Sequence, residues 1–346
     1  MKAAVFKARG EPLAIEEVPD PKPGPAELVL KVCACGICGT DLHWADMPAA
    51  DENWRPLLPG SVMGHEFAGE VVEVGRDLKG RWKAGDRVCA QPFVGCGTCP
   101  ACLAGRAYRC PAALTRASQQ LPGAYAEYTR IGTHETLRLP DSVGFGEGAL
   151  VEPLAVGLAA VRRARLEQGD AVLIVGGGPV GLSVALFCKF FGARHVVVSD
   201  LVHARAERAA EFGATAAIDA RNEDVAARFK QLTGGGPTVV FDAVGVPGSL
   251  QTVIDYAENY SRVVVVGLCM AQDQFFPARA IKKELDISFA FVYTKADFEF
   301  VIEMLGRERI DASGLITERV GFEAFPSAFE ALKRPTDQIK VLLTPF

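Results

Sequence analysis

The sequence predicts an α/β protein that combines a doubly wound parallel sheet with a second, smaller and mostly β domain. Three observations support this fold class. The part of the chain before Glu152 consists of short β-rich segments separated by Gly and Pro turns. After Glu152, short apolar segments alternate with helix-like segments, which is typical of a parallel sheet covered on both faces. A glycine-rich segment at residues 176–181 joins one predicted strand to a helix.

Length and composition agree with a folded chain of about two domains. The 346 residues correspond to two domains of roughly 150 residues each, and 49% hydrophobic with 23% charged residues can form a core. The formal net charge of -5 offers no basic surface for a phosphate backbone, so we expect no nucleic-acid partner. The N-terminal residues lack the apolar segment of a signal peptide, and we expect a cytoplasmic protein.

In the first domain, Val and other β-formers between Gly and Pro residues predict strands at 1–7, 28–33 and 66–75. Residues 19–25 contain four prolines and must form a loop, because proline cannot donate the hydrogen bond of a central strand.

In the second domain, alternation predicts strands and helices in turn. Strands are expected at 171–175, 195–200, 238–242 and 262–267, and helices at 156–166, 181–191 and 203–212. After residue 289 the pattern becomes mixed, with helices expected at 296–305 and 326–333 and a closing strand at 340–343. We therefore place the domain boundaries near residues 153 and 290.

One segment raises the possibility of a membrane span. Residues 171–188 carry no charge, and their number, eighteen, is the lower limit for a transmembrane helix. Four glycines and Pro179 interrupt the segment, so a strand, a turn and a buried helix are favoured, and we expect no membrane partner.

Four of the ten cysteines lie within fifteen residues, with two-residue and seven-residue spacers between them: Cys96, Cys99, Cys102 and Cys110. Thiolates at this spacing in a Gly/Pro turn can close on one tetrahedral ion, and four thiolates leave no open position. An iron–sulfur cluster or two disulfides are the alternatives. The expected reducing compartment and the lack of other redox features favour a structural zinc.

A second set of ligand types lies elsewhere in the first domain. A thiol, a hydroxyl, a carboxylate and an imidazole are brought together in one turn, followed by a His-Glu pair and a Glu-Pro pair; the residues are Cys38, Thr40, Asp41, His43, His65, Glu66 and Glu152. One Cys, one His and one carboxylate make a mixed site that keeps a position open for water or substrate. Zinc in such a site acts as a Lewis acid toward an alcohol or carbonyl oxygen.

The glycine segment has the context of a dinucleotide-binding turn. It matches G-x-G-x-x-G between a buried strand and a helix, and contributes Gly176, Gly178, Pro179, Val180 and Gly181. The N–H groups at the start of the helix can bind phosphates. Asp200 ends the next strand, nineteen residues after Gly181, where a carboxylate accepts hydrogen bonds from a ribose diol and disfavours a 2′-phosphate. We therefore expect NAD, although Arg205 could cover the adenine or reach a phosphate.

Taken together and in this order, these motifs resemble the medium-chain, zinc-dependent alcohol dehydrogenases over essentially the whole chain. Residues 152–156, Glu-Pro-Leu-Ala-Val, are most similar to the branch with polyol, butanediol and threonine dehydrogenases. The resemblance implies a zinc-binding, GroES-like catalytic domain of residues 1–153 completed by 290–346, around an NAD-binding Rossmann domain of residues 154–289. It also implies two zinc ions per subunit, an alcohol or carbonyl substrate, and a homodimer or homotetramer.

By this resemblance Cys38 and His65 are fixed ligands of the catalytic zinc. The ethanol-oxidising branches have a cysteine as third ligand where this chain has Glu152, so either Glu66 or Glu152 supplies the third ligand, directly or through water. Asp41 matches a residue that orients the site. Thr40 and His43 match a proton relay from substrate to solvent.

The resemblance extends to cofactor and substrate contacts. Val244, Leu268 and Phe291 match positions on the nicotinamide side. Aromatic residues of the predicted substrate pocket, Trp44, Trp54 and Phe93, favour a secondary or hydrophobic alcohol over a sugar polyol, unless they only fill the core. The competing functions are an NAD(P)H enone or quinone reductase that needs no zinc and a non-enzymatic protein on the same fold; the second ligand set argues against both.

Overall fold

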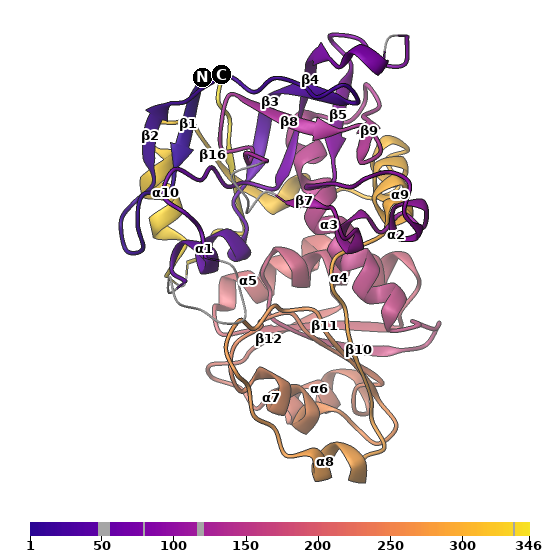
Figure 1. The fold of residues 1–346 in the computed structure, drawn as a ribbon. Helices are drawn as coiled ribbons and strands as arrows, with labels where there is room; N and C mark the ends of the chain where they lie inside the picture. Colours follow the sequence, from indigo (N-terminus) through magenta and orange to yellow (C-terminus); the bar gives the residue numbers. More distant parts are fainter. Residues whose placement is uncertain (48–55, 79, 116–120, 335) are drawn as a thin grey trace. The chain divides into compact units, whose positions relative to one another are not determined.

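The computed structural model describes residues 1–346 except 48–55, 79, 116–120 and 335. The chain divides into two compact units (Figure 1). The first comprises Met1–Glu152 and Thr294–Phe346, and the second comprises Pro153–Tyr293. Among the described residues, no helix combines the length and apolarity needed to cross a bilayer.

The first unit is built on a mixed sheet with the strand order β16-β17-β3-β4-β5-β9, and β8 pairs with β3. The strands are β3 (Glu27–Gly36), β4 (Glu66–Val74), β5 (Arg87–Ala90), β8 (Tyr128–Gly132), β9 (Thr136–Arg138), β16 (Ile316–Val320) and β17 (Lys340–Leu343). The antiparallel pair β1 (Lys2–Val5) and β2 (Ala14–Glu17) lies outside this sheet. Strands β16 and β17 come from the end of the chain, so the C-terminal segment completes the sheet that begins near the N-terminus.

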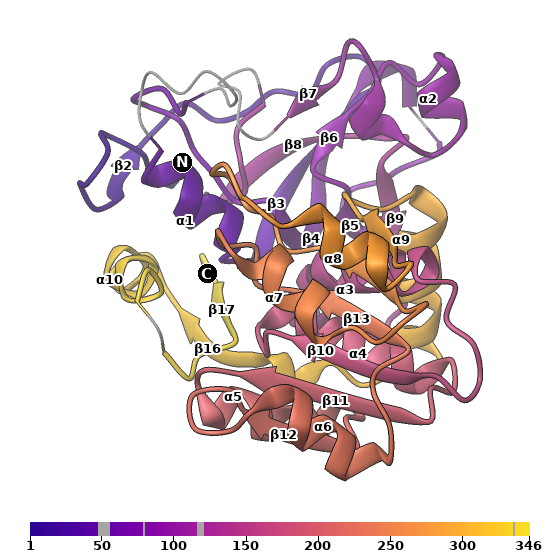
Figure 2. The ribbon, with the colours of Figure 1, turned by 90° about the horizontal axis from the view of Figure 1, so that it is seen from below.

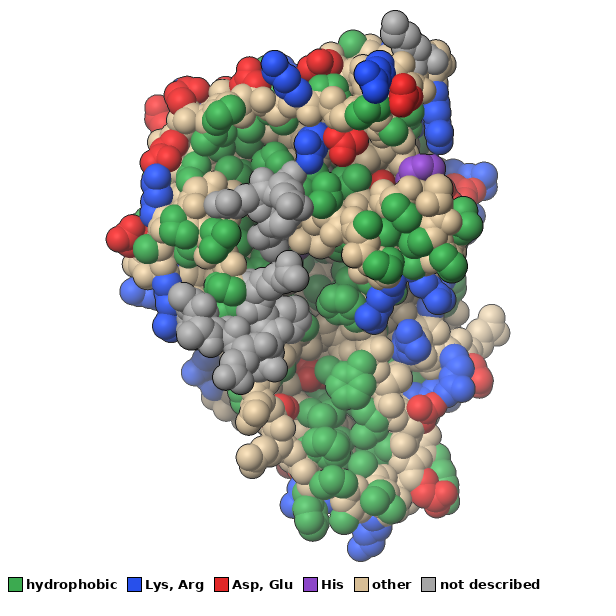
Figure 3. All heavy atoms as spheres, in the orientation of Figure 1, with side chains coloured by type: hydrophobic (Ala, Val, Ile, Leu, Met, Phe, Trp, Pro, Cys, Tyr) green, Lys and Arg blue, Asp and Glu red, His purple; other side chains and the backbone are tan. Residues whose placement is uncertain are grey.

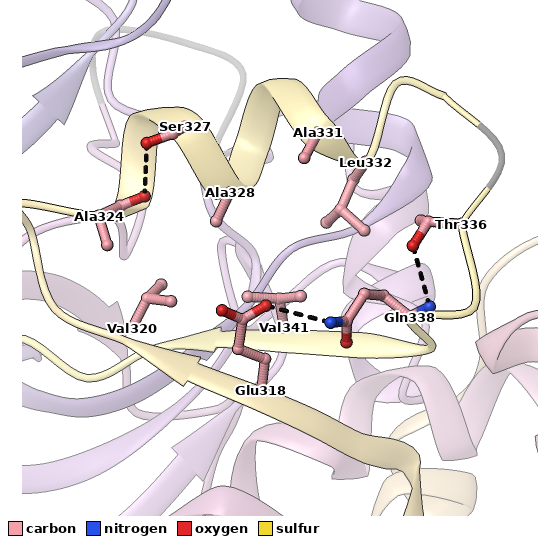
Figure 4. A pocket seen from close by; sticks show the side chains of 10 residues that line it. All are labelled: Glu318, Val320, Ala324, Ser327, Ala328, Ala331, Leu332, Thr336, Gln338 and Val341. Carbon is pink, nitrogen blue, oxygen red and sulfur yellow. Dashed lines mark hydrogen bonds between the residues drawn. The ribbon is translucent and has the colours of Figure 1, made fainter.

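The core of this unit combines apolar residues from β3, β4 and the C-terminal helix α10 (Phe325–Ala331). Figure 2 shows α10 beside β16 and β17. The helix begins with Pro326 in its first turn, where a missing N–H costs no hydrogen bond. A pocket of about 360 Å³ lies between α10 and these two strands and is lined mainly by small and apolar side chains (Figure 4).

Short elements complete the first unit. Helix α1 (Gly39–Ala45) follows β3. The cysteine lobe consists of β6 (Phe93–Val94), α2 (Pro100–Leu103), η2 (Ala107–Arg109) and β7 (Leu114–Thr115). Helix α9 (Lys295–Gly306) has a capping box between Thr294 and Asp297.

The second unit is a parallel sheet with the strand order β12-β11-β10-β13-β14-β15. The strands are β10 (Ala171–Val175), β11 (His195–Asp200), β12 (Ala216–Asp219), β13 (Val239–Asp242), β14 (Arg262–Val265) and β15 (Asp286–Phe289), and every neighbouring pair is parallel. Helices α4 (Pro179–Phe190), α5 (His203–Arg208), α6 (Val225–Thr233), α7 (Ser249–Tyr256) and α8 (Pro277–Lys282) connect them. This order is that of a Rossmann fold.

The charge-free segment 171–188 is strand β10, a glycine turn and helix α4, as predicted. The expected helix at 156–166 was placed wrongly. Helix α3 runs from Phe145 to Arg163 and contains Pro153. The apolar residues Val151 and Leu154 on either side of this proline are completely buried, and their burial outweighs the hydrogen bond that proline removes.

Candidate active site and metal centres

The pairing of β3 with β4 brings the predicted ligands of the catalytic zinc together. Gly36 at the end of β3 lies opposite Glu66 at the start of β4. Cys38 follows two residues after Gly36, and His65 directly precedes β4. The ligand atoms of Cys38, His65 and Glu66 all lie within 4.8 Å of one another. This thiol, imidazole and carboxylate form a donor set that suits zinc.

Asp41 orients the imidazole of His65. Its Oδ1 lies 3.2 Å from His65 Nδ1, and Asp41 is only 1% exposed. Because a carboxylate accepts, the proton belongs on Nδ1, and Nε2 keeps its lone pair for a metal. Burial acts to lower the pKa of His65, but the Asp41 carboxylate and the Cys38 thiolate outweigh it, and this pKa lies well above its usual value.

Glu66 forms a buried ion pair that the sequence analysis missed. Lys340 Nζ on β17 donates to Glu66 Oε1 at 2.7 Å, to Oε2 at 2.6 Å and to the Ile37 carbonyl at 2.9 Å. Burial acts to lower the pKa of Lys340, but Glu66 and Cys38 raise it above its usual value. A Cβ at Gly36 would lie 2.1 Å from Glu66 Oε2, so glycine leaves room for the pair. No local motif marks Lys340, which is 274 residues away from Glu66.

Glu152 lies on α3 and is 8% exposed. Among the described residues, the ligand cluster contains Glu66 and not Glu152. Glu152 is nevertheless near enough to contribute to the raised pKa of Lys340. Both carboxylates therefore belong to the electrostatic surroundings of one buried ammonium group.

The predicted relay and pocket residues lie on or near α1 and the cysteine lobe. Thr40 is half-buried and His43 is exposed, both on α1. Trp44 on the same helix packs against the core of the unit. The Phe93 ring lies 6.1 Å from that of Tyr108. Trp54 lies outside the described residues.

The four cysteines of the lobe form a second cluster, with all four sulfur atoms within 4.8 Å of one another. Cys96 Sγ accepts hydrogen bonds from the Thr98 hydroxyl at 3.6 Å and the Cys99 N–H at 3.4 Å. The Thr98 and Cys99 N–H groups and the Thr98 hydroxyl lower the pKa of Cys96 to about 6, whereas burial raises the pKa of Cys102 to about 12. All ten cysteines lie within the described residues and are in the thiol form, with no disulfide between them.

The glycine turn allows a tight connection between β10 and α4. Gly176 has φ +104°, and a Cβ at Gly181 would lie 1.8 Å from the Gly176 carbonyl oxygen. Gly178 is the N-cap of α4, and a Cβ there would meet no atom within 4 Å. Glycine at 181 is thus needed for packing, whereas glycine at 178 leaves open space at the helix N-terminus.

Asp200 is held by the backbone at the end of β11. Its Oδ2 accepts the Gly177 N–H and its Oδ1 accepts the Val202 N–H, both at 2.7 Å. The carboxylate is thereby fixed beside the glycine turn. The Arg205 carbonyl lies next to Gly177, so Arg205 also belongs to this end of the sheet.

The three remaining cofactor candidates follow the carboxyl ends of adjacent strands. Val244 follows β13, Leu268 follows β14 and Phe291 follows β15. Asp242 at the end of β13 supports the loop that contains Val244, a role that the sequence analysis missed. Its Oδ1 accepts the Val244 N–H at 3.0 Å, and its Oδ2 accepts the Ser249 hydroxyl at 2.6 Å.

Two family models match the chain: an alcohol dehydrogenase GroES-like domain over residues 24–141 and a zinc-binding dehydrogenase over residues 179–307. A sorbitol dehydrogenase of Bacillus subtilis is 34% identical over 348 residues, covering 100% of this chain and 97% of that protein.

Solved structures give the same result. The 2R,3R-butanediol dehydrogenase of Bacillus subtilis has a TM-score of 0.86 at 30% identity, covering 100% of this chain and 99% of that one. A Sinorhizobium meliloti protein assigned as a zinc-binding dehydrogenase, solved with NADP bound, has a TM-score of 0.86 at 28% identity and covers 99% of each chain. The protein therefore belongs to the zinc-dependent medium-chain alcohol dehydrogenases, and transfers hydride between an alcohol and a nicotinamide dinucleotide.

Proposed function

We propose that Cys38, His65 and Glu66 hold the catalytic zinc of this alcohol dehydrogenase. The proposal is carried by one observation: the three ligand atoms form a compact cluster, beside a carboxylate that orients the imidazole. When bound there, zinc supplies Lewis-acid polarisation of a substrate oxygen. Glu152 supports the site from α3, as an alternative ligand or through a water molecule.

The residues of α1 move the proton that alcohol oxidation releases. The Thr40 hydroxyl accepts it near the substrate while giving up its own proton toward His43, which is exposed on the same helix and exchanges a proton with solvent. Residues 1–153 and 290–346 form the catalytic domain in this proposal, and Cys96, Cys99, Cys102 and Cys110 hold a structural zinc within it.

Residues 154–289 bind the dinucleotide. Gly176, Gly178, Pro179, Val180 and Gly181 approach its phosphates, while Val244, Leu268 and Phe291 contact the nicotinamide side. Asp200 accepts hydrogen bonds from the ribose diol and favours NAD over NADP, since a 2′-phosphate would meet its carboxylate. Arg205 lies beside the same turn, where it covers the adenine.

The substrate is a secondary alcohol or diol with a hydrophobic part. The half-buried aromatic rings of Trp44 and Phe93 support this class, with Trp54 as a third predicted member. The names of the relatives, sorbitol and 2R,3R-butanediol dehydrogenase, add vicinal diols to the compounds worth testing.

The decisive experiment combines metal counting with a substrate panel. We expect about two zinc ions per chain and NAD-dependent oxidation of secondary alcohols or vicinal diols. Cys38→Ser should lose one zinc and all turnover. Glu66→Gln and Glu152→Gln then compare the carboxylates, and the variant that loses zinc more readily identifies the ligand. A wild type with a single zinc that Cys38→Ser retains would contradict the proposal.

We also propose a cytoplasmic homo-oligomer. The cysteines of the lobe form no disulfide and lie together as thiols that could bind a metal, which suits a reducing compartment. Strand β15 ends the strand order of its sheet, and Phe276, Ile281 and Phe289 around it are 62%, 74% and 65% exposed. Figure 3 shows hydrophobic side chains gathered where Figure 1 draws α7 and α8. An unpaired apolar edge of this kind suits a second copy of the chain.

A further inference from the structure

We propose that Tyr125 is a positioning residue for the catalytic zinc site, holding Asp41 and through it the imidazole of His65. The inference rests on the proposed zinc site above. Tyr125 belongs to neither the proposed zinc ligands nor the expected proton relay, yet its hydroxyl is hydrogen-bonded to Asp41 beside them.

The side chain of Tyr125 is completely buried, and its hydroxyl meets two acceptors. It lies 2.5 Å from Asp41 Oδ2 and 3.2 Å from the Gly36 carbonyl oxygen. The other oxygen of Asp41 faces His65 Nδ1 at 3.2 Å. A hydroxyl, a carboxylate and an imidazole thus form a continuous chain, and its first link is a charge-assisted hydrogen bond.

The backbone around Tyr125 binds the segment that leads to His65. The Tyr125 N–H donates to the Met63 carbonyl and the Ala124 N–H to the Gly64 carbonyl, both at 2.9 Å. Gly64 has φ +98°, and a Cβ there would lie 2.6 Å from the Tyr125 ring. The hydroxyl also meets the Gly36 carbonyl, two residues before Cys38. Tyr125 therefore contacts the chain segments directly before Cys38 and directly before His65.

The aromatic ring of Tyr125 packs against two aromatic rings of α10. Its centroid lies 4.8 Å from that of Phe325 and 6.3 Å from that of Phe329. The ring cannot turn away without displacing buried aromatic side chains. Phenylalanine would fill the same space, so packing alone does not explain the hydroxyl.

The hydroxyl determines which atom of Asp41 faces the histidine. With Oδ2 bound to Tyr125, Oδ1 remains for the N–H at Nδ1 of His65, and Nε2 keeps its lone pair directed at the metal position. Without the hydroxyl, the buried Oδ2 of Asp41 loses this donor, and the orientation of the carboxylate is less constrained.

The test compares Tyr125→Phe with Tyr128→Phe, a matched substitution three residues along the chain, where the ring packs on Phe346. Zinc transfer to a chromogenic chelator is followed in both variants. We expect Tyr125→Phe to lose one of its two zinc ions about tenfold faster than wild type, with the ion of the cysteine lobe unchanged as an internal reference. Cobalt-substituted Tyr125→Phe should show altered d–d absorption, and kcat should fall while KM for NAD stays the same.

A double-mutant cycle with Asp41→Asn separates positioning from simple packing. If Tyr125 acts through Asp41, Tyr125→Phe changes zinc loss little in the Asp41→Asn background. Additive effects, wild-type zinc loss in Tyr125→Phe, or a lowered melting temperature with both ions lost equally would overturn the inference. A wild type with a single zinc that Cys38→Ser retains would instead reject the proposed zinc site, so the two failures are distinguishable.

Discussion

Individual residues around the proposed zinc ligands carry buried charge, among them the ion pair of Lys340 and Glu66. Both side chains are at most 2% exposed. Lys340→Met leaves a buried carboxylate without its partner, and we expect zinc-free protein to lose about 3–5 kcal/mol of unfolding free energy. The loss should be smaller with zinc bound, because the metal compensates the carboxylate. Denaturant titration with and without chelator measures both.

Lys333→Met is the control for this prediction. Lys333 forms an ion pair with Asp46 at 3.0 Å, and Asp46 is half exposed. A pair that reaches solvent contributes no more than about 1 kcal/mol. Equal losses in the two lysine variants would contradict a special role for the buried pair.

The raised pKa of His65 predicts how zinc binding depends on pH. In metal-free protein, the charged imidazole adds stability that is fully present below its usual value of 6.5 and disappears as pH rises through the raised pKa. Zinc needs the neutral imidazole, so protons compete with the metal at every pH below the raised pKa. Zinc affinity of the Cys38 site should therefore fall steadily as the pH drops below the raised pKa of His65. Competition titrations with a chelator measure this, and a pH-independent affinity would contradict the assignment of His65 as ligand.

Among the elements, the cysteine lobe is the one least able to fold by its own packing. Helix α2 has four residues, and β6 and β7 have two each. Such short elements gain little from hydrogen bonding or burial, so we expect the proposed structural zinc to supply much of the stability of the lobe. Cys99→Ser should lower the melting temperature and lose the lobe zinc, whereas Cys38→Ser should abolish turnover with nearly unchanged melting. Calorimetry and metal analysis of both variants measure this difference. Identical melting temperatures of Cys99→Ser and Cys38→Ser would contradict the prediction.

The glycine turn before α4 offers a second contrast at the level of one element. A Cβ at residue 181 would overlap the Gly176 carbonyl, but one at residue 178 would meet nothing within 4 Å. Gly181→Ala should therefore destabilise the protein, while Gly178→Ala should fold normally and bind NADH at least tenfold more weakly. Gly235→Ala, also at an open position, is the neutral control. Fluorescence titration with NADH and thermal melting distinguish the three variants. Unchanged NADH affinity in Gly178→Ala would show that the phosphates of the cofactor do not bind at this turn.

At the scale of the whole molecule, the exposed apolar edge beside β15 predicts self-association. Phe289→Glu places a charge on this edge, and we expect it to shift the protein toward monomer in sedimentation velocity. Leu58→Glu, at a residue that is 55% exposed in the other unit, should leave the oligomer intact. If Phe289→Glu sediments like the wild type, the edge is not the interface.

Local sequence patterns were sufficient to predict some helices and strands and insufficient to predict others. The strand, glycine turn and helix at β10 and α4 were predicted because buried apolar segments and glycine positions lie next to each other in the sequence. Helix α6 was missed, although Asp224 caps its start and Gly234 ends it. Helix α3 was expected to begin only at residue 156, after a domain boundary near residue 153, whereas the structure has one helix from Phe145 to Arg163 that continues through Pro153.

The sequence by itself determined the family resemblance, the parallel dinucleotide-binding sheet and the four-cysteine cluster, since each was recognised from local motifs whose own residues lie a few positions apart. The tertiary structure decided how the catalytic cluster is held. The register of β3 against β4 brings Cys38 to His65, β17 supplies Lys340 to Glu66, and the segment before β8 supplies the Tyr125 hydroxyl to Asp41. These contacts join segments far apart in the chain. A buried charge must be paired, and its partner is whichever group the folded chain places beside it, however distant in sequence.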